Sequence, residues 1–454
     1  MKQKKEDNMV SPNRKVAIVG MGGAFPNCKD LPDFKQRLFA GESFIREWDE
    51  TMLYGSSIRS KVSGFIDPND LSIETIYCSV VEGYPREYVD TLGRIPAANS
   101  VTADMSAMGS MLGALEAIEM AGWNKSEIQS EQTAVAIGTN SGGYQIGRPG
   151  WVSVFQKHQK TKLLGPYYAI RGMVYREAAH VSGLIKNQGI SESLGSACAT
   201  GLGNVGYAYR LIKFGLQDRA LAGGSEGNSI ETFAGLDAMG VLSRGFSPAE
   251  SSRPFDVNRK GLVCSFGSGV VALEEYEMAK ARGANILAVI DSYFNNVDGD
   301  GDLFFPSYYA QKRLWKGLMD QHPIKPDVVK VHGTSTRAGD PVELFSVVDV
   351  LGEDGYQISA PKSQLGHTLG GAGAIELIAA VMMLQEQKIL PCLNANDFNE
   401  ELEPLQRTEG WDGPSHPIAY YKHLISNKVV EKEINQIVCC LLYTSDAADE
   451  PRHG

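Results

Sequence analysis

Several features are scarce or missing in this sequence of 454 residues, and each absence excludes a class of protein. Basic residues are outnumbered, with 43 Lys and Arg against 54 Asp and Glu, and the net charge is −11. A general nucleic-acid binder needs a basic face to neutralise phosphates, so we expect no nucleic-acid partner. There is no run of about 18 apolar residues, and we therefore expect no membrane span. Residues 1–14 are charged and lack an apolar signal core, so secretion is not indicated.

Cysteines are few and irregularly spaced, which argues against a disulfide framework. The seven cysteines are Cys28, Cys78, Cys198, Cys264, Cys392, Cys439 and Cys440. An odd number at irregular spacing suits reduced thiols in the cytoplasm, where we expect this protein to be located.

What the sequence does contain is a regular alternation of strand and helix patterns, punctuated by glycine. Hydrophobic residues make up 43% of the chain, enough for a large core, and the 49 glycines gather mostly at the ends of apolar segments. Apolar runs at 15–19 and 133–137 predict strands buried on both faces. Helix patterns at 105–122 and 199–214 follow, and the second half repeats the alternation, with a helix predicted at 371–384. This order predicts an α/β fold with parallel strands, built from two closely packed halves.

Cys198 is the first candidate for chemistry. It lies among small residues in Gly195-Ser-Ala-Cys-Ala-Thr-Gly201, at the predicted start of a helix. The exposed amides and the positive dipole end of a helix N-terminus favour a thiolate, and small neighbours let a substrate carbonyl approach the sulfur. A buried, inert cysteine is the alternative that this segment alone leaves open.

His332 opens a second candidate segment, His332-Gly-Thr-Ser-Thr-Arg-Ala-Gly-Asp340-Pro-Val-Glu343, directly after a predicted strand. Loops after strands often carry functional side chains in α/β enzymes. Thr334 and Thr336 stand at alternate positions and suit hydrogen bonds to an extended ligand arm. The alternative is a structured turn in which Asp340 is a capping residue.

The third segment, Lys362-Ser-Gln-Leu-Gly-His367-Thr-Leu-Gly-Gly-Ala-Gly373, combines a cation, a histidine and a glycine-rich helix start. Alone, it fits an anion site or a plain loop. Cys198, His332 and His367 could in principle bind zinc. However, no local ligand pair of the C-x-x-C or H-x-x-x-H type is present, and we expect no metal.

Together, the three segments resemble the β-ketoacyl-acyl carrier protein synthases, the condensing enzymes of fatty acid and polyketide synthesis. The chain has Ser-Ala-Cys-Ala-Thr at 196–200, His-Gly-Thr-Ser-Thr at 332–336 and Lys-x-x-x-Gly-His-x-Leu-Gly at 362–370, in the family's order and spacing. The resemblance covers 15–439 and points to the discrete synthase I and II type. His367 is the residue that separates the elongating branch from the initiating branch, which has asparagine there.

The resemblance implies a thiolase-like α/β fold, in which two similar halves have mixed sheets between helices, and a homodimer. We expect a disordered tail at 1–14, a first half at 15–275 that carries the nucleophile, and a second half at 276–439 that carries both histidines.

The resemblance also implies a role for each candidate residue. Cys198 would accept the acyl chain, and its backbone N–H would form half of the oxyanion hole. His332 and His367 would polarise the malonyl thioester carbonyl and stabilise the enolate. Lys362 would tune the electrostatics around the histidines.

The remaining candidates support these groups. Glu343 would hold Lys362 in a charged network, and Asp340 would support the loop. Thr334 and Thr336 would bind phosphopantetheine, which arrives on the acyl carrier protein, so no cofactor is expected to be resident.

The expected activity is decarboxylating Claisen condensation of an enzyme-bound acyl chain with malonyl-acyl carrier protein, giving β-ketoacyl-acyl carrier protein. Two alternatives remain open. One is a thiolase-type acyltransferase that does not decarboxylate its donor. The other is a non-catalytic partner subunit of a condensing-enzyme heterodimer.

The C-terminal residues 440–454 depart from the family pattern. The family has a glycine-rich loop with a phenylalanine near this point, which supplies the other oxyanion N–H. This chain instead reads Cys440-Leu-Leu-Tyr-Thr-Ser-Asp-Ala-Ala-Asp449, which resembles a translated sequencing adapter. We expect these residues to be non-native and the second half to be truncated, which leaves the activity of the chain as it stands open.

Overall fold

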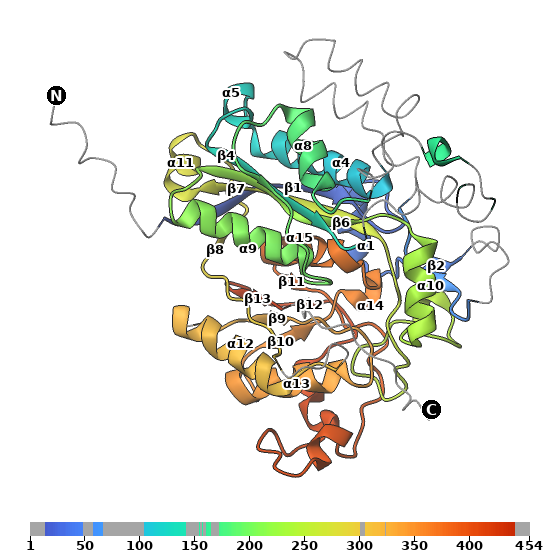
Figure 1. Ribbon diagram of the computed structural model, residues 1–454. Helices are drawn as coiled ribbons and strands as arrows, with labels where there is room; N and C mark the ends of the chain where they lie inside the picture. Colours follow the sequence, from blue (N-terminus) through green and yellow to red (C-terminus); the bar gives the residue numbers. More distant parts are fainter. Residues whose placement is uncertain are drawn as a thin grey trace.

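The structure is a computed structural model that describes residues 14–48, 58–66, 104–141, 154, 157, 160–164, 172–299, 305–322 and 324–440. In this part of the chain, two main sheets alternate with three layers of helices (Figure 1). Helices cover the outer face of each sheet, and two further helices lie between the sheets. The predicted α/β, thiolase-like fold is confirmed.

The first sheet has six strands in the order β5-β4-β6-β7-β1-β8. β4 is parallel to β5 and β6, whereas the pairs β6–β7, β7–β1 and β1–β8 are antiparallel. Their bounds are β1 (Val16–Ala24), β4 (Thr133–Thr139), β5 (Ser191–Glu192), β6 (Arg219–Glu226), β7 (Gly267–Glu275) and β8 (Ala288–Ile290). The sheet is mixed, as the resemblance implies. The parallel strands predicted from the alternation are present in β5-β4-β6, whereas β7, β1 and β8 run antiparallel to their neighbours. Glu226 and Gly267 are paired, so the connection between β6 and β7 leaves and re-enters the sheet at the same end.

Alternate residues of the central strands face opposite helix layers. In β1, Ala17 and Val19 pack against α4 (Met105–Ala121) and α8 (Arg176–Ile185) on the outer face. Val16 and Ile18 face α9 (Thr200–Lys213) and α15 (Ala372–Glu386), which form the middle layer. The nearly continuous apolar pattern of these strands follows from this double burial.

The second sheet is smaller and entirely parallel, in the order β10-β9-β13. Its strands are β9 (Val328–Lys330), β10 (Gln357–Ser359) and β13 (Ile437–Cys439). Val329 packs against α12 (Tyr308–Gln321) and α13 (Gly339–Leu351) on the outer side, whereas Val328 joins the core around α15. The middle layer is therefore shared by both sheets.

α15 is the most apolar of the long helices that pack in this core. The window Leu369–Glu386 is long and apolar enough to cross a membrane, and 78% of it is buried inside the protein. A core helix of a globular protein meets the same criterion, and α15 has that environment between the two sheets.

The remaining elements are short and connect these layers. The helices are α1 (Leu31–Phe39), α5 (Lys125–Ile128), α10 (Ile230–Met239), α11 (Tyr276–Ala281) and α14 (Lys362–Leu365). The 3₁₀ helices are η3 (Thr161–Leu164), η4 (Pro248–Glu250), η5 (Leu369–Gly371), η6 (Pro404–Arg407) and η7 (Ile418–Leu424). Two small strand pairs are β2 (Arg46–Glu47) with β3 (Val62–Ser63), and β11 (Lys388–Ile389) with β12 (Val430–Glu431).

Three observations bear on the predicted ends of the N-terminal tail and of the two halves. Residues 1–13 and 441–454 lie outside the described residues, whereas Arg14 pairs with Asp218 at 2.7 Å and Cys440 is buried. β8, which follows the expected boundary at 275, pairs with β1 of the first sheet. The boundary between the halves stays a prediction.

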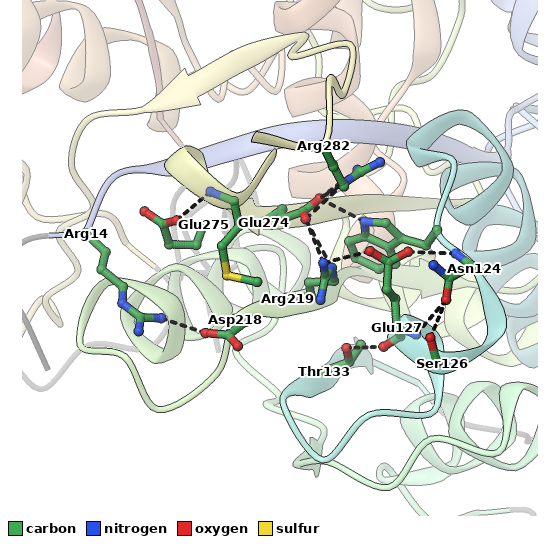
Figure 2. Close-up of polar contacts among 12 residues, drawn as sticks. Arg14, Asn124, Ser126, Glu127, Thr133, Asp218, Arg219, Glu274, Glu275 and Arg282 are labelled. Atoms are coloured by element: carbon green, nitrogen blue, oxygen red, sulfur yellow. Dashed lines mark hydrogen bonds and ion pairs between the residues drawn. The ribbon is translucent and has the colours of Figure 1, made fainter. Parts of the chain in front are cut away.

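A buried ion cluster fastens one end of the first sheet (Figure 2). Glu274, at the end of β7, is fully buried. Its carboxylate accepts hydrogen bonds from Arg219 Nε at 3.1 Å, Arg282 Nη2 at 2.7 Å and Trp123 Nε1 at 3.0 Å. Arg219 also pairs with Glu127 at 2.8 Å. The cluster therefore ties β6 and β7 to α11 and to the segment after α4.

Replacing Glu274 by alanine should lower the free energy of unfolding by about 3 kcal/mol, because the buried Arg219 and the half-buried Arg282 lose their shared carboxylate. Urea unfolding followed by circular dichroism measures the change. Glu431→Ala, which breaks the exposed Lys388–Glu431 pair at 3.5 Å, is the matched control and should have little effect. Equal losses in the two variants would contradict the structural role given to Glu274.

Candidate active site

Cys198 lies in the turn that leads into α9, two residues before the helix begins at Thr200. Ala197 has a φ of 46°, in the left-handed region that non-glycine residues seldom adopt. The turn is closed by hydrogen bonds from Ala199 N to Ser196 O at 2.9 Å and from Thr200 N to Ala197 O at 3.1 Å. The thiol therefore lies at the positive end of α9, where the sequence predicted it, and Cys198 is 9% exposed.

Glycines let the start of α9 approach the loop that carries His367. A Cβ on Gly224 of β6 would lie 2.2 Å from the carbonyl oxygen of Gly370 and 2.7 Å from Cα of Gly201. No side chain fits at these distances, so the three segments pack backbone against backbone. This contact brings Cys198 and His367 to the same place.

The structure brings Cys198, His332 and His367 together from three separate segments. His332 comes just after β9, and His367 comes just after α14. One side-chain donor atom from each of the three residues lies within 4.8 Å of the other two. The two imidazole rings are perpendicular, with centroids 5.0 Å apart. The predicted grouping of these residues is therefore present in the fold.

The hydrogen bonds of the histidines determine their tautomers. Leu369 N donates to Nδ1 of His367 at 3.2 Å, and Nζ of Lys362 lies 3.2 Å from Nδ1 of His332. A protonated lysine only donates, so Nδ1 is the acceptor in both rings, and each neutral ring carries its proton on Nε2. Both Nε2 atoms are buried and have no hydrogen-bond partner among the described residues. Two N–H donors are therefore available to a ligand beside Cys198.

Burial and nearby cations keep both imidazoles neutral. The pKa of His332 lies well below its ordinary value, because burial and the charge of Lys362 disfavour the imidazolium. The pKa of His367 is lowered for the same two reasons. The role in tuning the histidines that the resemblance gave to Lys362 agrees with these shifts.

Lys362 makes its short ion pair with Glu376 of α15. Nζ of Lys362 lies 2.5 Å from Oε1 of Glu376, and both side chains are buried. The other oxygen, Oε2, lies 2.6 Å from Nζ of Lys330. Burial lowers the pKa of Lys362, and Glu376 opposes that shift. Sequence reasoning missed Glu376, although a carboxylate near the start of an otherwise apolar stretch of helix was a usable signal.

Glu343 and Lys362 attract one another through their charges, as expected, but the short contacts of the Glu343 carboxylate are with backbone amides. Glu343 lies in the first turns of α13, beneath the loop, and its carboxylate accepts from His332 N at 2.6 Å and Gly333 N at 2.8 Å. Gly333, with a φ of 47°, turns these two amides toward it. Asp340 supports the same loop, as expected, since it accepts from Ser335 N at 3.0 Å.

Thr334 and Thr336 lie beside one another in this loop and are buried. Their hydroxyl oxygens are 3.1 Å apart. Arg259 Nε donates to the carbonyl oxygen of Thr336 at 2.9 Å and so anchors the loop. The two hydroxyls form a compact polar pair, and their role in binding phosphopantetheine stays a prediction.

Glu226 is a second carboxylate that sequence reasoning missed. It lies at the end of β6 and accepts from Gly370 N at 3.2 Å and Ser141 N at 3.1 Å. Burial raises its pKa to about 7. Because it touches the loop after His367, we regard it as a support for that loop.

Metal ions in other proteins are bound by the same side-chain types as those of Cys198, His332 and His367. Here the buried ammonium group of Lys362 lies next to His332, and the charges of Lys362 and Lys330 both lower the pKa of His332. The same positive potential opposes a divalent cation. The arrangement therefore fits a thiol with two N–H donors better than it fits a metal site.

A cavity of about 510 Å³ also borders the nucleophile turn. It lies between α9, the segment 291–296 and β13, and it touches Ser196 and Ala199. Cys198, His332 and His367 do not line it. The candidate catalytic groups therefore lie outside this cavity.

Sequence comparison decides the family. The model named "Beta-ketoacyl synthase, N-terminal domain" matches residues 13–279, and the corresponding C-terminal domain matches residues 287–396. The chain belongs to the β-ketoacyl synthase family. Cys198 falls in the matched N-terminal domain, and both histidines fall in the matched C-terminal domain.

Curated relatives and solved structures agree with this placement. The chain is 37% identical to 3-oxoacyl-[acyl-carrier-protein] synthase 1 of Haemophilus influenzae, over 63% of this chain and 71% of the relative. It is 29% identical to synthase 2 of Vibrio cholerae, over 86% and 90%. A β-ketoacyl synthase structure from Burkholderia phymatum superposes with a TM-score of 0.76 at 26% identity, over 93% of this chain and 94% of that one. The ishigamide ketosynthase/chain length factor has the same fold, with a TM-score of 0.77 at 21% identity, over 96% of each chain.

Nitrogen-15 NMR of the histidine side chains tests the tautomers of this synthase. We expect His332 and His367 to show protonated Nε2 and unprotonated Nδ1, and to stay neutral from about pH 6 to 8, because their pKa values are lowered. The signals are assigned with His332→Ala and His367→Ala, and the exposed His423 serves as reference. Titration of either ring near its ordinary pKa would contradict the electrostatic description of the site.

Proposed function

We propose that this chain catalyses the decarboxylating condensation of an acyl chain, held on Cys198, with malonyl-acyl carrier protein. The product is a β-ketoacyl-acyl carrier protein of fatty acid or related polyketide synthesis. The observation that carries the proposal is a thiol within 4.8 Å of two buried histidine nitrogens, in a chain of the β-ketoacyl synthase family. The three groups suit the three steps of this reaction.

In the first step, the sulfur of Cys198 attacks the acyl thioester carbonyl. The bond from that carbonyl to the sulfur of phosphopantetheine breaks, and the leaving thiolate takes the proton that Cys198 loses. Placement of the thiol at the positive end of α9 favours its anionic form, which is the attacking species.

In the second step, the thioester carbonyl oxygen of the malonyl group accepts hydrogen bonds from Nε2–H of His332 and His367. The bond to the carboxylate breaks, carbon dioxide leaves, and the electron pair forms an enolate. Two N–H donors in a buried site stabilise the charge that develops on this oxygen. Because they are neutral and fixed, they need little rearrangement as the charge forms.

In the third step, the enolate carbon attacks the carbonyl of the acyl group on Cys198. A carbon–carbon bond forms, the bond to Cys198 sulfur breaks, and the thiolate is restored and takes a proton from solvent. The β-ketoacyl product stays on the carrier protein.

The carrier is the partner that this chemistry requires. Its phosphopantetheine would lie along Thr334 and Thr336, whose hydroxyls are paired at 3.1 Å beside His332. We propose that no cofactor is resident, because the arm arrives on the carrier. We also propose that the protein is cytoplasmic and forms a homodimer. Light scattering of the purified chain measures the oligomeric state.

The same residues weigh against the first of the two alternatives, and a measurement separates the second. A non-catalytic partner subunit has no need of a cysteine and two oriented histidines in one buried cluster. A thiolase-type enzyme that does not decarboxylate would use an acetyl donor as readily as a malonyl donor, and the measurements below distinguish the two donors.

Cys198→Ala should abolish acyl transfer to the protein, because the attacking sulfur is removed. Intact mass spectrometry after mixing with an acyl-acyl carrier protein measures this: the unaltered protein should gain the mass of the acyl group. Cys28→Ala, at a buried cysteine near α1, is the matched control and should still be acylated. Acylation of the Cys198→Ala variant would show that another residue is the nucleophile.

His332→Ala and His367→Ala should each slow release of carbon dioxide from malonyl-acyl carrier protein by about 100-fold or more, since each removes one enolate donor. Labelled carbon dioxide measures this step, and intact mass follows acylation of Cys198, which should persist. His423→Ala serves as the surface control. Equal use of acetyl and malonyl donors by the unaltered protein would favour the thiolase-type alternative.

A further inference from the structure

Lys330 is a buried cation that has no role in the reaction steps proposed above. It is the last residue of β9, fully buried, and flanked in sequence by Val328, Val329 and Val331. Alternation along the strand places Val329 toward α12 and α13, so Lys330 faces the opposite side, toward α15. The carboxylate of Glu376 lies there.

Both contacts of the Lys330 ammonium group are short. Nζ lies 2.6 Å from Oε2 of Glu376 and 2.6 Å from the carbonyl oxygen of Cys440. Burial disfavours the charge of Lys330, but attraction to Glu376, the hydrogen bond to it and the nearby Cys439 and Cys440 together raise the pKa of Lys330. Lys330 is therefore a charged group in the middle of the protein. A buried ion pair adds little stability compared with apolar residues of similar volume, so stability alone gives a weak reason for it.

Glu376 connects Lys330 to the histidine that faces the substrate. Its second oxygen, Oε1, lies 2.5 Å from Nζ of Lys362, and that nitrogen lies 3.2 Å from Nδ1 of His332. The chain of contacts runs from Lys330 through Glu376 and Lys362 to His332. It ends at Nε2 of His332, which has no partner among the described residues.

We propose that Lys330 is a positioning residue for the condensation: it occupies one oxygen of Glu376, so that Lys362 binds only the other and keeps an N–H directed at Nδ1 of His332. His332 then presents Nε2–H to the malonyl carbonyl. Without Lys330, both carboxylate oxygens of Glu376 become available to Lys362, whose ammonium is drawn away from His332. This inference rests on the proposed function, because it concerns how the enolate donor is oriented.

Lys330 also supplies a second positive charge to the cluster. Two ammonium groups share Glu376, while the other nearby carboxylate, Glu343, is bound to backbone amides. The charge of Lys330 opposes protonation of His332 and of His367. The titratable and charged groups around His332 and its network of Lys362, Glu376 and Lys330 are Cys198, Lys330, Glu343, Lys362, His367, Glu376, Cys439 and Cys440. Removal of Lys330 therefore makes the net charge around His332 more negative by one.

The test compares two half-reactions in the full chain. Lys330→Met removes the charge and keeps much of the volume, and Lys330→Gln keeps an N–H donor without the charge. Lys388→Met, at an exposed lysine of β11, is the matched control. Release of carbon dioxide from malonyl-acyl carrier protein reports on His332. Acylation of Cys198, followed by intact mass, reports on the rest of the site and on folding.

We expect both Lys330 variants to release carbon dioxide about tenfold to 100-fold more slowly through kcat, with acylation changed by less than about threefold. The lower-pH limb of the decarboxylation rate should move up by about one pH unit, because His332 loses a neighbouring cation and gains proton affinity. Lys330→Gln should be the milder variant, since it still occupies an oxygen of Glu376. Lys388→Met should behave as the unaltered protein.

Three results would overturn the inference. Both half-reactions could fall in parallel with an unmoved pH limb, both variants could fail to fold, or both could react normally; the first two assign Lys330 a structural role only. If the unaltered protein acylates and decarboxylates, these results count against Lys330 and leave the proposed function standing. If the unaltered protein does neither, the proposed function itself fails, and this inference fails with it.

Discussion

The site depends on the close packing of α9, the Gly370 turn and β6, where glycines allow backbone to touch backbone. A Cβ at Gly201 would lie 2.8 Å from the backbone nitrogen of Ala374, at the start of α15. The starts of α9 and α15 therefore meet between the two sheets, and the turns that precede them carry Cys198 and His367. The third group, His332, enters from the end of β9 in the second sheet. The candidate active site is therefore built from segments of both halves.

Burial in this middle layer controls the chemistry of the histidines. A water-exposed imidazole titrates near neutral pH, whereas both rings here are buried near two ammonium groups, and their pKa values are lowered. Neutral rings with Nδ1 already engaged can only donate from Nε2. The fold thus makes each histidine a hydrogen-bond donor, although a neutral histidine can also act as a base. Stabilisation of an enolate requires this choice.

Sequence patterns predicted what is local and missed what is assembled over distance. The helices α4, α9 and α15 and the strand β4 were placed within a few residues, and so was the start of β1, which runs on past the predicted end at 19 to Ala24, because periodicity and glycine punctuation are local signals. Resemblance to a family then grouped Cys198, His332 and His367, which no spacing rule connects. The antiparallel course of β7 escaped prediction, because it depends on where a long connection returns to the sheet. Glu376 was missed for a related reason: the motif that contains Lys362 could not reveal that its short ion pair is with a carboxylate on α15.

The arrangement of carboxylates and lysines around His332 follows a single physical rule. Each buried charge must have a partner, and the identity of that partner determines what remains free for the substrate. Glu343 accepts hydrogen bonds from two loop amides and attracts Lys362 only through its charge. Glu376 is divided between two lysines, so Lys362 retains a donor for His332. Stability alone is a weak reason for a second lysine in the core. Lys330 is explained if it occupies one oxygen of Glu376, so that Lys362 keeps an N–H for His332.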